Sequence, residues 1–90
     1  MTRILCKGAE AALPTTTGAA TSFSEATVVR LTNTATAADH LVTVVETQSG
    51  DVVGSFTLLR GSSELLEKNP TQCVFAANAA VLGAKVGFTG

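Results

Sequence analysis

Short runs of alternating apolar and polar residues recur along most of the chain, and residues 81–89 carry the clearest one. Two sets of side chains alternate in this run. The first set contains Leu82, Ala84, Val86 and Phe88, and the second contains Gly83, Lys85, Gly87 and Thr89. A period of two is typical of a strand with one face in the core. We therefore expect the first set inside and the second toward solvent or a partner. Because the sequence ends directly afterwards, we expect this strand at a sheet edge.

Six earlier segments also predict strands, because they are rich in β-branched or apolar residues and are bounded by turn-forming residues. They are residues 1–7, 26–33, 40–48, 52–59, 64–68 and 71–76. The strongest turn lies at residues 49–51, Ser-Gly-Asp, since glycine tolerates positive φ and aspartate bonds its own backbone. Further turns are expected at residues 34–39 and 61–63. In the strand that follows residue 51, Gly54 indicates a bulge or a close approach of another strand.

Two segments contain helix-favouring residues without predicting a long helix. Residues 64–68 read ELLEK, but a Gly-Ser-Ser turn and Asn69-Pro70 bound them too closely for a stable helix, so we expect a short strand. Residues 8–22 are alanine-rich, yet Pro14 and the threonines at 15–17 oppose helix. We expect an extended linker or wrapping loop there, with a short helical turn at Ala9–Leu13.

About seven short strands with turns every 8 to 12 residues are typical of a small antiparallel β-sandwich. The predicted fold class is therefore all-β, Ig-like or jelly-roll-like. The chain has no tryptophan and lacks Cys-Trp-Cys spacing, so it is not an immunoglobulin domain proper. Its 90 residues fit one domain, with an N-terminal strand and arm at 1–22 and a sandwich body at 23–90.

The surface is expected to be nearly neutral, because only 14% of the residues are charged, against about 25% in typical domains. Such a surface is poorly protected against association, although some small soluble domains simply carry few charges. The net charge is −1 and the six basic residues are scattered, which argues against nucleic-acid binding. We see neither a long apolar run nor a signal peptide, so we expect a soluble chain without a membrane partner.

Cys6 and Cys73 are the only cysteines, and they lie far apart in the sequence. Without a secretory signal we expect two reduced, half-buried thiols. A disulfide stays open as an alternative if the first and last strands are neighbours. Neither cysteine has the CxxC spacing of a redox or zinc site.

The remaining candidates for chemistry do not form a recognisable constellation. Asp39 and His40 are adjacent, and neighbours on a strand point to opposite faces, so we expect an exposed histidine rather than a relay. Four carboxylates lie outside any calcium-loop motif: Glu46, Asp51, Glu64 and Glu67. Glu67 and Lys68 are interpreted as a solvated strand end. We therefore predict no catalytic, metal-binding or cofactor-binding residues and no small-molecule substrate.

From Val28 onward, about two thirds of the chain resembles small virion structural proteins of tailed phages, particularly those of marine cyanobacteria. The resemblance rests on four stretches: VRLTN (29–33), GSFTLLRG (54–61), ELLEKNPTQ (64–72) and AKVGFT (84–89). It implies a β-sandwich that decorates or cements a capsid, or a component of the tail. It does not extend to residues 1–26.

Two functional hypotheses follow. The first is a non-enzymatic virion protein, made in the host cytoplasm, that contacts the major capsid protein and itself through the 1–22 arm and one sheet face. The alternative is a tail or fibre component, or a sandwich whose loops at 34–39 and 49–51 bind a glycan or host receptor. A small enzyme or metal protein is disfavoured by the missing constellations.

Overall fold

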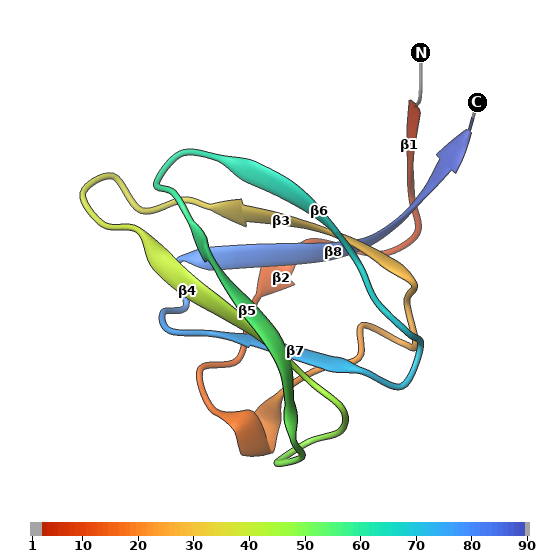
Figure 1. Cartoon of the computed structure of the whole chain (residues 1–90). Coiled ribbons are helices and arrows are strands. Elements are labelled where there is room, and N and C mark those ends of the chain that lie inside the picture. Colours follow the sequence, from red (N-terminus) through yellow and green to blue (C-terminus); the bar gives the residue numbers. More distant parts are fainter. Residues whose placement is uncertain (1–2, 90) are drawn as a thin grey trace.

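The computed structural model describes residues 3–89, with the side chains of residues 5–87, and forms two facing antiparallel sheets (Figure 1). The first sheet contains β1 (Arg3–Cys6), β2 (Ala11–Ala12), β3 (Val28–Asn33), β6 (Ser63–Glu67) and β8 (Val81–Thr89). The second contains β4 (His40–Val45), β5 (Val52–Leu58) and β7 (Cys73–Ala76). Their orders are β1-β8-β3-β6, with β2 also on β8, and β5-β4-β7. The predicted all-β sandwich is confirmed, including the short strand within ELLEK.

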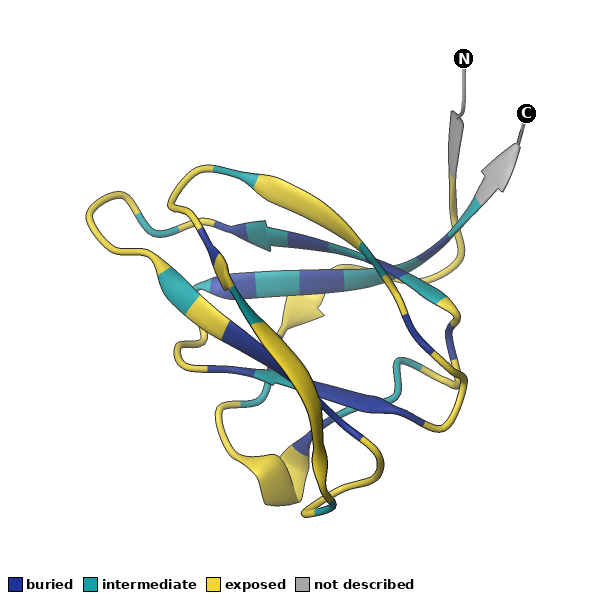
Figure 2. Cartoon of the chain, in the orientation of Figure 1, coloured by how far each residue is buried: buried dark blue, intermediate teal, exposed yellow. Residues whose placement is uncertain are grey.

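The core lies between the sheets and is built from alternate residues of facing strands (Figure 2). Val29 and Leu31 of β3 point toward Val42 of β4 and Val74 of β7, and all four are fully buried. Three half-buried side chains complete the rim: Phe23, Phe56 and Leu66. Small aliphatic side chains suit this thin interior, because β-branched residues pack well on a pleated surface.

The two expectations for β8 need correction. The strand is not at an edge, since it pairs with β1 and β2 on one side and with β3 on the other. Val86 is buried as predicted, but Leu82 and Ala84 are only half-buried, whereas Gly83 is buried. Gly83 faces inward because the ring of Phe23, from a distant segment, fills the core space where a side chain at residue 83 would lie. The side chains of Phe88 and Thr89 lie outside the described residues, as do Met1 and Thr2 of the predicted first strand.

Residues 8–22 wrap their own domain. Leu13 is buried in the core, its N–H donates to Val81 O, and Pro14 O accepts from Ala76 N–H. Thr21 then bridges to Val74 of β7 in both directions. The predicted turn at Ala9–Leu13 is wrong: β2 forms there, and one turn of 3-10 helix, η1, lies at Thr17–Ala19. The segment covers the edge of β7, so it is engaged within its own chain rather than free to reach a neighbour.

The turns predicted at residues 34–39, 49–51 and 61–63 connect strands as expected. Ser49 and Gly61 take positive φ, of 57° and 71°. The register between β4 and β5 shifts between Val44 and Val45, which leaves Val53 unpaired next to Gly54. Gly54 therefore marks a bulge, the first of its two predicted roles, and a Cβ built at Gly54 would meet no atom within 4 Å.

Candidate interaction surface

One long side of the sandwich is open. β5 and β6 are each the last strand of their sheet, and both lie on the side opposite the 8–22 segment. Phe56 of β5 and Leu66 of β6 line a shallow hollow between them, together with Glu64 and Leu65. The opposite side is closed, because residues 8–22 join β8 to β7 there. We call the open flank the β5–β6 side.

Most exposed apolar side chains lie along β5, on its neighbour β4 or on β6. Among the residues whose side chains the structure describes, six large hydrophobic ones are exposed, and only Leu5 lies elsewhere. The other five, with their exposed fractions, are Leu41 (45%), Val52 (64%), Val53 (49%), Leu59 (58%) and Leu65 (47%). Isolated exposed apolar residues are ordinary, whereas a group of them is typical of an interaction site. This surface is therefore the best candidate for function.

Strand β5 is also an edge without charge. Residues 52–59 contain no charged residue and no proline, although such residues normally discourage pairing at an exposed edge. The flanking positions are charged with opposite signs, Asp51 before the strand and Arg60 after it. An edge of this kind is a template for an additional strand.

The backbone groups that β5 offers follow from the pairing inside its sheet. Alternate residues of a strand direct their N–H and C=O groups to opposite sides. Ala77 N–H donates to Leu41 O on the β7 side, so the next residue, Val42, directs its groups toward β5. Val42 faces Phe56, whose backbone is thus used within the sheet. The residues on either side of Phe56 face away from it: Ser55 and Thr57.

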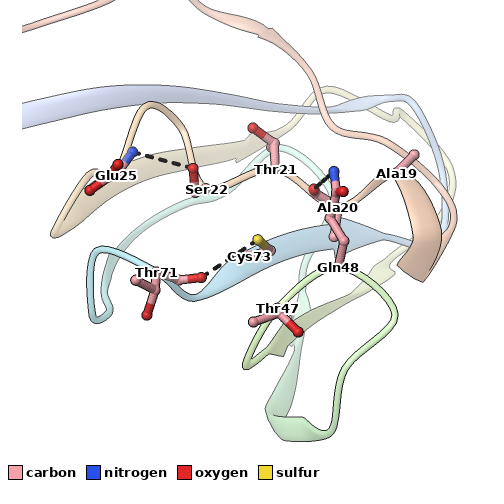
Figure 3. A pocket seen from close by; sticks show the side chains of 9 residues that line it. All are labelled: Ala19, Ala20, Thr21, Ser22, Glu25, Thr47, Gln48, Thr71 and Cys73. Atoms are coloured by element: carbon pink, nitrogen blue, oxygen red, sulfur yellow. Dashed lines mark hydrogen bonds between the residues drawn. The ribbon is translucent and has the colours of Figure 1, made fainter.

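A second feature is a polar depression of about 650 Å³ at the end of the sandwich near η1 (Figure 3). Its polar groups bond to nearby backbone: Gln48 Nε2 donates to Ala20 O at 2.9 Å, and Ser22 Oγ accepts from Glu25 N–H at 3.3 Å. The Cys73 thiol lies 3.7 Å from Thr71 O. These bonds hold neighbouring loops together, and they do not converge on one point where a ligand would sit.

The residues considered for catalysis are dispersed. Asp39 Oδ1 accepts from Arg60 N–H at 2.9 Å, which fixes a turn beside half-buried His40. Cys73 pairs with Val45 at the far end of β4 from His40, about 17 Å along the strand. They therefore form no thiol–imidazole pair. Among the described residues, no three histidine, cysteine, aspartate or glutamate side chains are grouped as metal ligands.

The four carboxylates lie in two pairs, on two separate parts of the fold. Glu46 and Asp51 flank the β4–β5 turn, and Glu46 Oε1 accepts from Gln72 Nε2 at 3.3 Å. Glu64 and Glu67 are exposed on β6. A glycosidase needs two carboxyl groups on opposite sides of one substrate bond. Among the described residues, no cleft has two carboxylates in its lining.

Lys68 is not the solvated strand end that the sequence suggested. It is 5% exposed, and its Nζ donates to Ala26 O at 2.8 Å and to Asn69 O at 3.3 Å. Burial lowers the pKa of this amine, the nearby Cys73 raises it, and Lys85 lowers it further. Lys68 N–H bonds Thr27 O, which extends the β3–β6 pairing by one residue and places the Lys68 side chain on the same inward face as Leu66. The sequence analysis did not predict that Lys68 is buried. Glu67 is exposed, as predicted.

The two cysteines are free, as predicted, but neither is half-buried: Cys6 is exposed and Cys73 is buried. The first and last strands are indeed neighbours. Cys73, however, lies on β7 of the other sheet, so this neighbourhood does not bring the thiols together. The loops at 34–39 and 49–51 also fail to meet, since they lie at opposite ends of β4.

Comparisons with protein-family models, with curated proteins and with solved structures gave no match to this chain. In the stretch from residue 3 to residue 89, we find no helix with the length and apolar character needed to cross a membrane.

Proposed function

We propose that the protein is a non-enzymatic structural subunit of a phage virion, and that it decorates or cements the capsid through contacts with the major capsid protein. The observation that carries the proposal is the β5–β6 side, where exposed apolar residues surround an uncharged edge strand. Groups of this kind on a small protein are typical of protein–protein contact. The resemblance to virion proteins supplies the identity of the partner.

The physical properties of the chain support an assembly role. A domain of this size buries only about 60 to 65% of its unfolded surface, so binding to a shell adds stability by mass action. Its dimensions, 34 × 32 × 20 Å, give it broad faces relative to its thickness. Two observations disfavour the glycan-binding alternative: the candidate loops are at opposite ends, and the polar depression has no aromatic side chain in its lining.

The test is co-sedimentation of the purified protein with expanded capsids of its phage, in parallel with isolated tails. We expect binding to capsids, weakened at least about tenfold by Leu59→Asp, because a buried unpaired charge is costly at an interface. Leu5→Asp is the matched control, since Leu5 is equally apolar and exposed but lies on β1. Binding to tails alone would favour a tail component. Absence of binding to either particle would contradict the proposal.

A further inference from the structure

We infer that β5 pairs with β5 of a second copy of this chain, antiparallel and centred on Ser55, so that the two three-stranded sheets join into one six-stranded sheet. The inference deepens the proposed assembly role, on which it rests, by naming one partner. It starts from the free edge of β5, where the backbone groups of Ser55 and Thr57 face away from the sheet. The regular part of this edge begins at Gly54, beyond the bulge at Val53.

Backbone geometry restricts the register of such a pair. Outward-facing residues must meet outward-facing residues, because only they have free N–H and C=O groups. A two-fold axis at Ser55 places Ser55 opposite its own copy and Thr57 opposite Val53, the residue at the bulge. Axes at Gly54, Phe56, Thr57 and Leu58 also satisfy this condition, so the backbone alone leaves five registers.

Side chains select the register at Ser55. In that register Phe56 of each copy lies opposite Gly54 of the other. Phe56 is half-buried at the rim of the core, and a side chain built at Gly54 would meet nothing within 4 Å, so the glycine leaves open space beside the strand. An aromatic ring across from a glycine on a neighbouring strand fills such a space. With the axis at Phe56, the two Phe56 rings would instead lie opposite each other. Leu58 would then lie opposite Gly54, but its side chain is already buried in the core and does not fill the space there.

Charge is consistent with this register and opposes an in-register parallel arrangement. With the axis at Ser55, Asp51 lies opposite Leu59 of the other copy, and therefore next to the other copy's Arg60. Two opposite-charge pairs then flank the joined strands, one at each end. A parallel pair would bring Asp51 to Asp51 and Arg60 to Arg60. Between these positions the strand has no charge to oppose the contact.

The decisive experiment is a charge exchange at Ser55, measured by sedimentation velocity across a dilution series of the full chain. Ser55→Lys or Ser55→Glu alone places two like charges directly opposite each other, and we expect the dimer dissociation constant to rise at least about tenfold. An equal mixture of the two variants should restore dimers. Both side chains project from an exposed position, so circular dichroism should match the parent protein.

Thr57→Lys is the matched control on the same strand. In the inferred register its lysine faces Val53, and we expect dissociation constants within about threefold of the parent. A second readout needs no variant: the amides of Ser55 and Thr57 should exchange hydrogen more slowly as protein concentration rises. A parent protein that stays monomeric throughout, an equal effect of Thr57→Lys, or a mixture that remains monomeric would each overturn the inference.

The two proposals fail separately. A monomer that binds capsids would overturn the paired β5 strands and leave the virion role intact. A dimer that binds neither capsids nor tails would contradict the virion role and leave the pairing of β5 strands intact.

Discussion

Asn33 ends β3 with a fully buried side chain that joins the β3–β4 connection to the end of β5. Its Nδ2 donates to Leu58 O at 2.9 Å and to Ala38 O at 3.2 Å, and its Oδ1 accepts from Ala35 N–H at 2.9 Å. A buried amide of this kind stabilises the fold because every polar atom has a partner. In a chain with few charges, it gives the β3–β4 turn a fixed position relative to β5.

Asn33→Ala should lower the free energy of unfolding by about 1 to 3 kcal/mol, because it removes these three bonds. Urea unfolding followed by circular dichroism measures the change. Thr36→Ala, in the same connection and exposed, should change it by less than about 0.5 kcal/mol. Equal stability of the two variants would show that Asn33 does not fix the turn.

Lys68 predicts a pH dependence of stability. Burial holds its pKa in the folded protein below the ordinary value of 10.5. Between these two values the unfolded chain binds more protons than the folded one, so the contribution of Lys68 to the free energy of unfolding rises with pH across that window. The difference between the parent protein and Lys68→Met should therefore shift in favour of the parent as pH increases toward 10.5.

Urea unfolding of both proteins at several pH values tests this sign, since the titrations of other groups are shared and largely cancel. Lys7→Met, at an exposed lysine, controls for the loss of one positive charge. A difference that stays constant, or falls as pH rises, would contradict the buried amine.

At the scale of elements, the position of β8 depends on a contact between distant segments. A Cβ added at Gly83 would lie 2.6 Å from Phe23 Cζ and 3.1 Å from Leu31 Cδ2. Phe23 reaches this position from a turn in which it and the next two residues all have positive φ, between 55° and 58°. The unusual turn thus delivers an aromatic ring to the core over a glycine.

Gly83→Ala should destabilise the protein by about 1 to 3 kcal/mol through overpacking. Phe23→Ala should also destabilise it, by about 3 kcal/mol or somewhat less because the ring is only partly buried. Combined, the two changes should be less harmful than their sum, because the smaller residue at 23 leaves room for the added methyl group. Additive effects in thermal or urea unfolding would show that the ring does not occupy the space above Gly83.

The sequence predicts those elements whose cause is local. Alternation and turn residues place the strands and the Ser-Gly-Asp turn, and the short distance between turn and proline identifies ELLEK as a strand. Three features have distant causes instead: Gly83 faces inward because of Phe23, β8 is internal because β1 and β2 pair with it, and Lys68 is buried where its amine bonds Ala26 O. A strand's pattern cannot reveal which segments will cover it.

The candidate surface was only partly predictable for the same reason. Low charge leaves a surface poorly protected against association, and residues 52–59 are visibly uncharged. Which edge stays open depends on the wrapping segment, which covers β7 and leaves β5 free. The sequence-based hypothesis assigned contacts to the 1–22 arm, of which residues 11–21 instead pack on the domain itself.

For the whole molecule, the two long sides of the sandwich therefore have different roles. Residues 8–22 close one side with backbone bonds and the buried Leu13, and this closure protects β7 from pairing with other chains. The other side keeps two free edge strands, β5 and β6. Closing the β7 edge reduces the number of edges that other chains can pair with, which disfavours open-ended aggregation.

This division predicts that the closing segment opens separately from the rest of the fold, and Cys73 reports on that opening. The thiol is buried with Ala20 of the segment in a small cluster that also contains Val45. In a Cys6→Ser background, which removes the exposed thiol, Leu13→Ala should lower stability by about 2 to 4 kcal/mol and speed modification of Cys73 by a thiol reagent. Thr15→Ala, exposed in the same segment, should do neither.

Local opening exposes little surface, so the labelling rate at low urea should depend only weakly on denaturant. A steep dependence, matching the m-value of global unfolding, would mean that the segment and the sandwich open together.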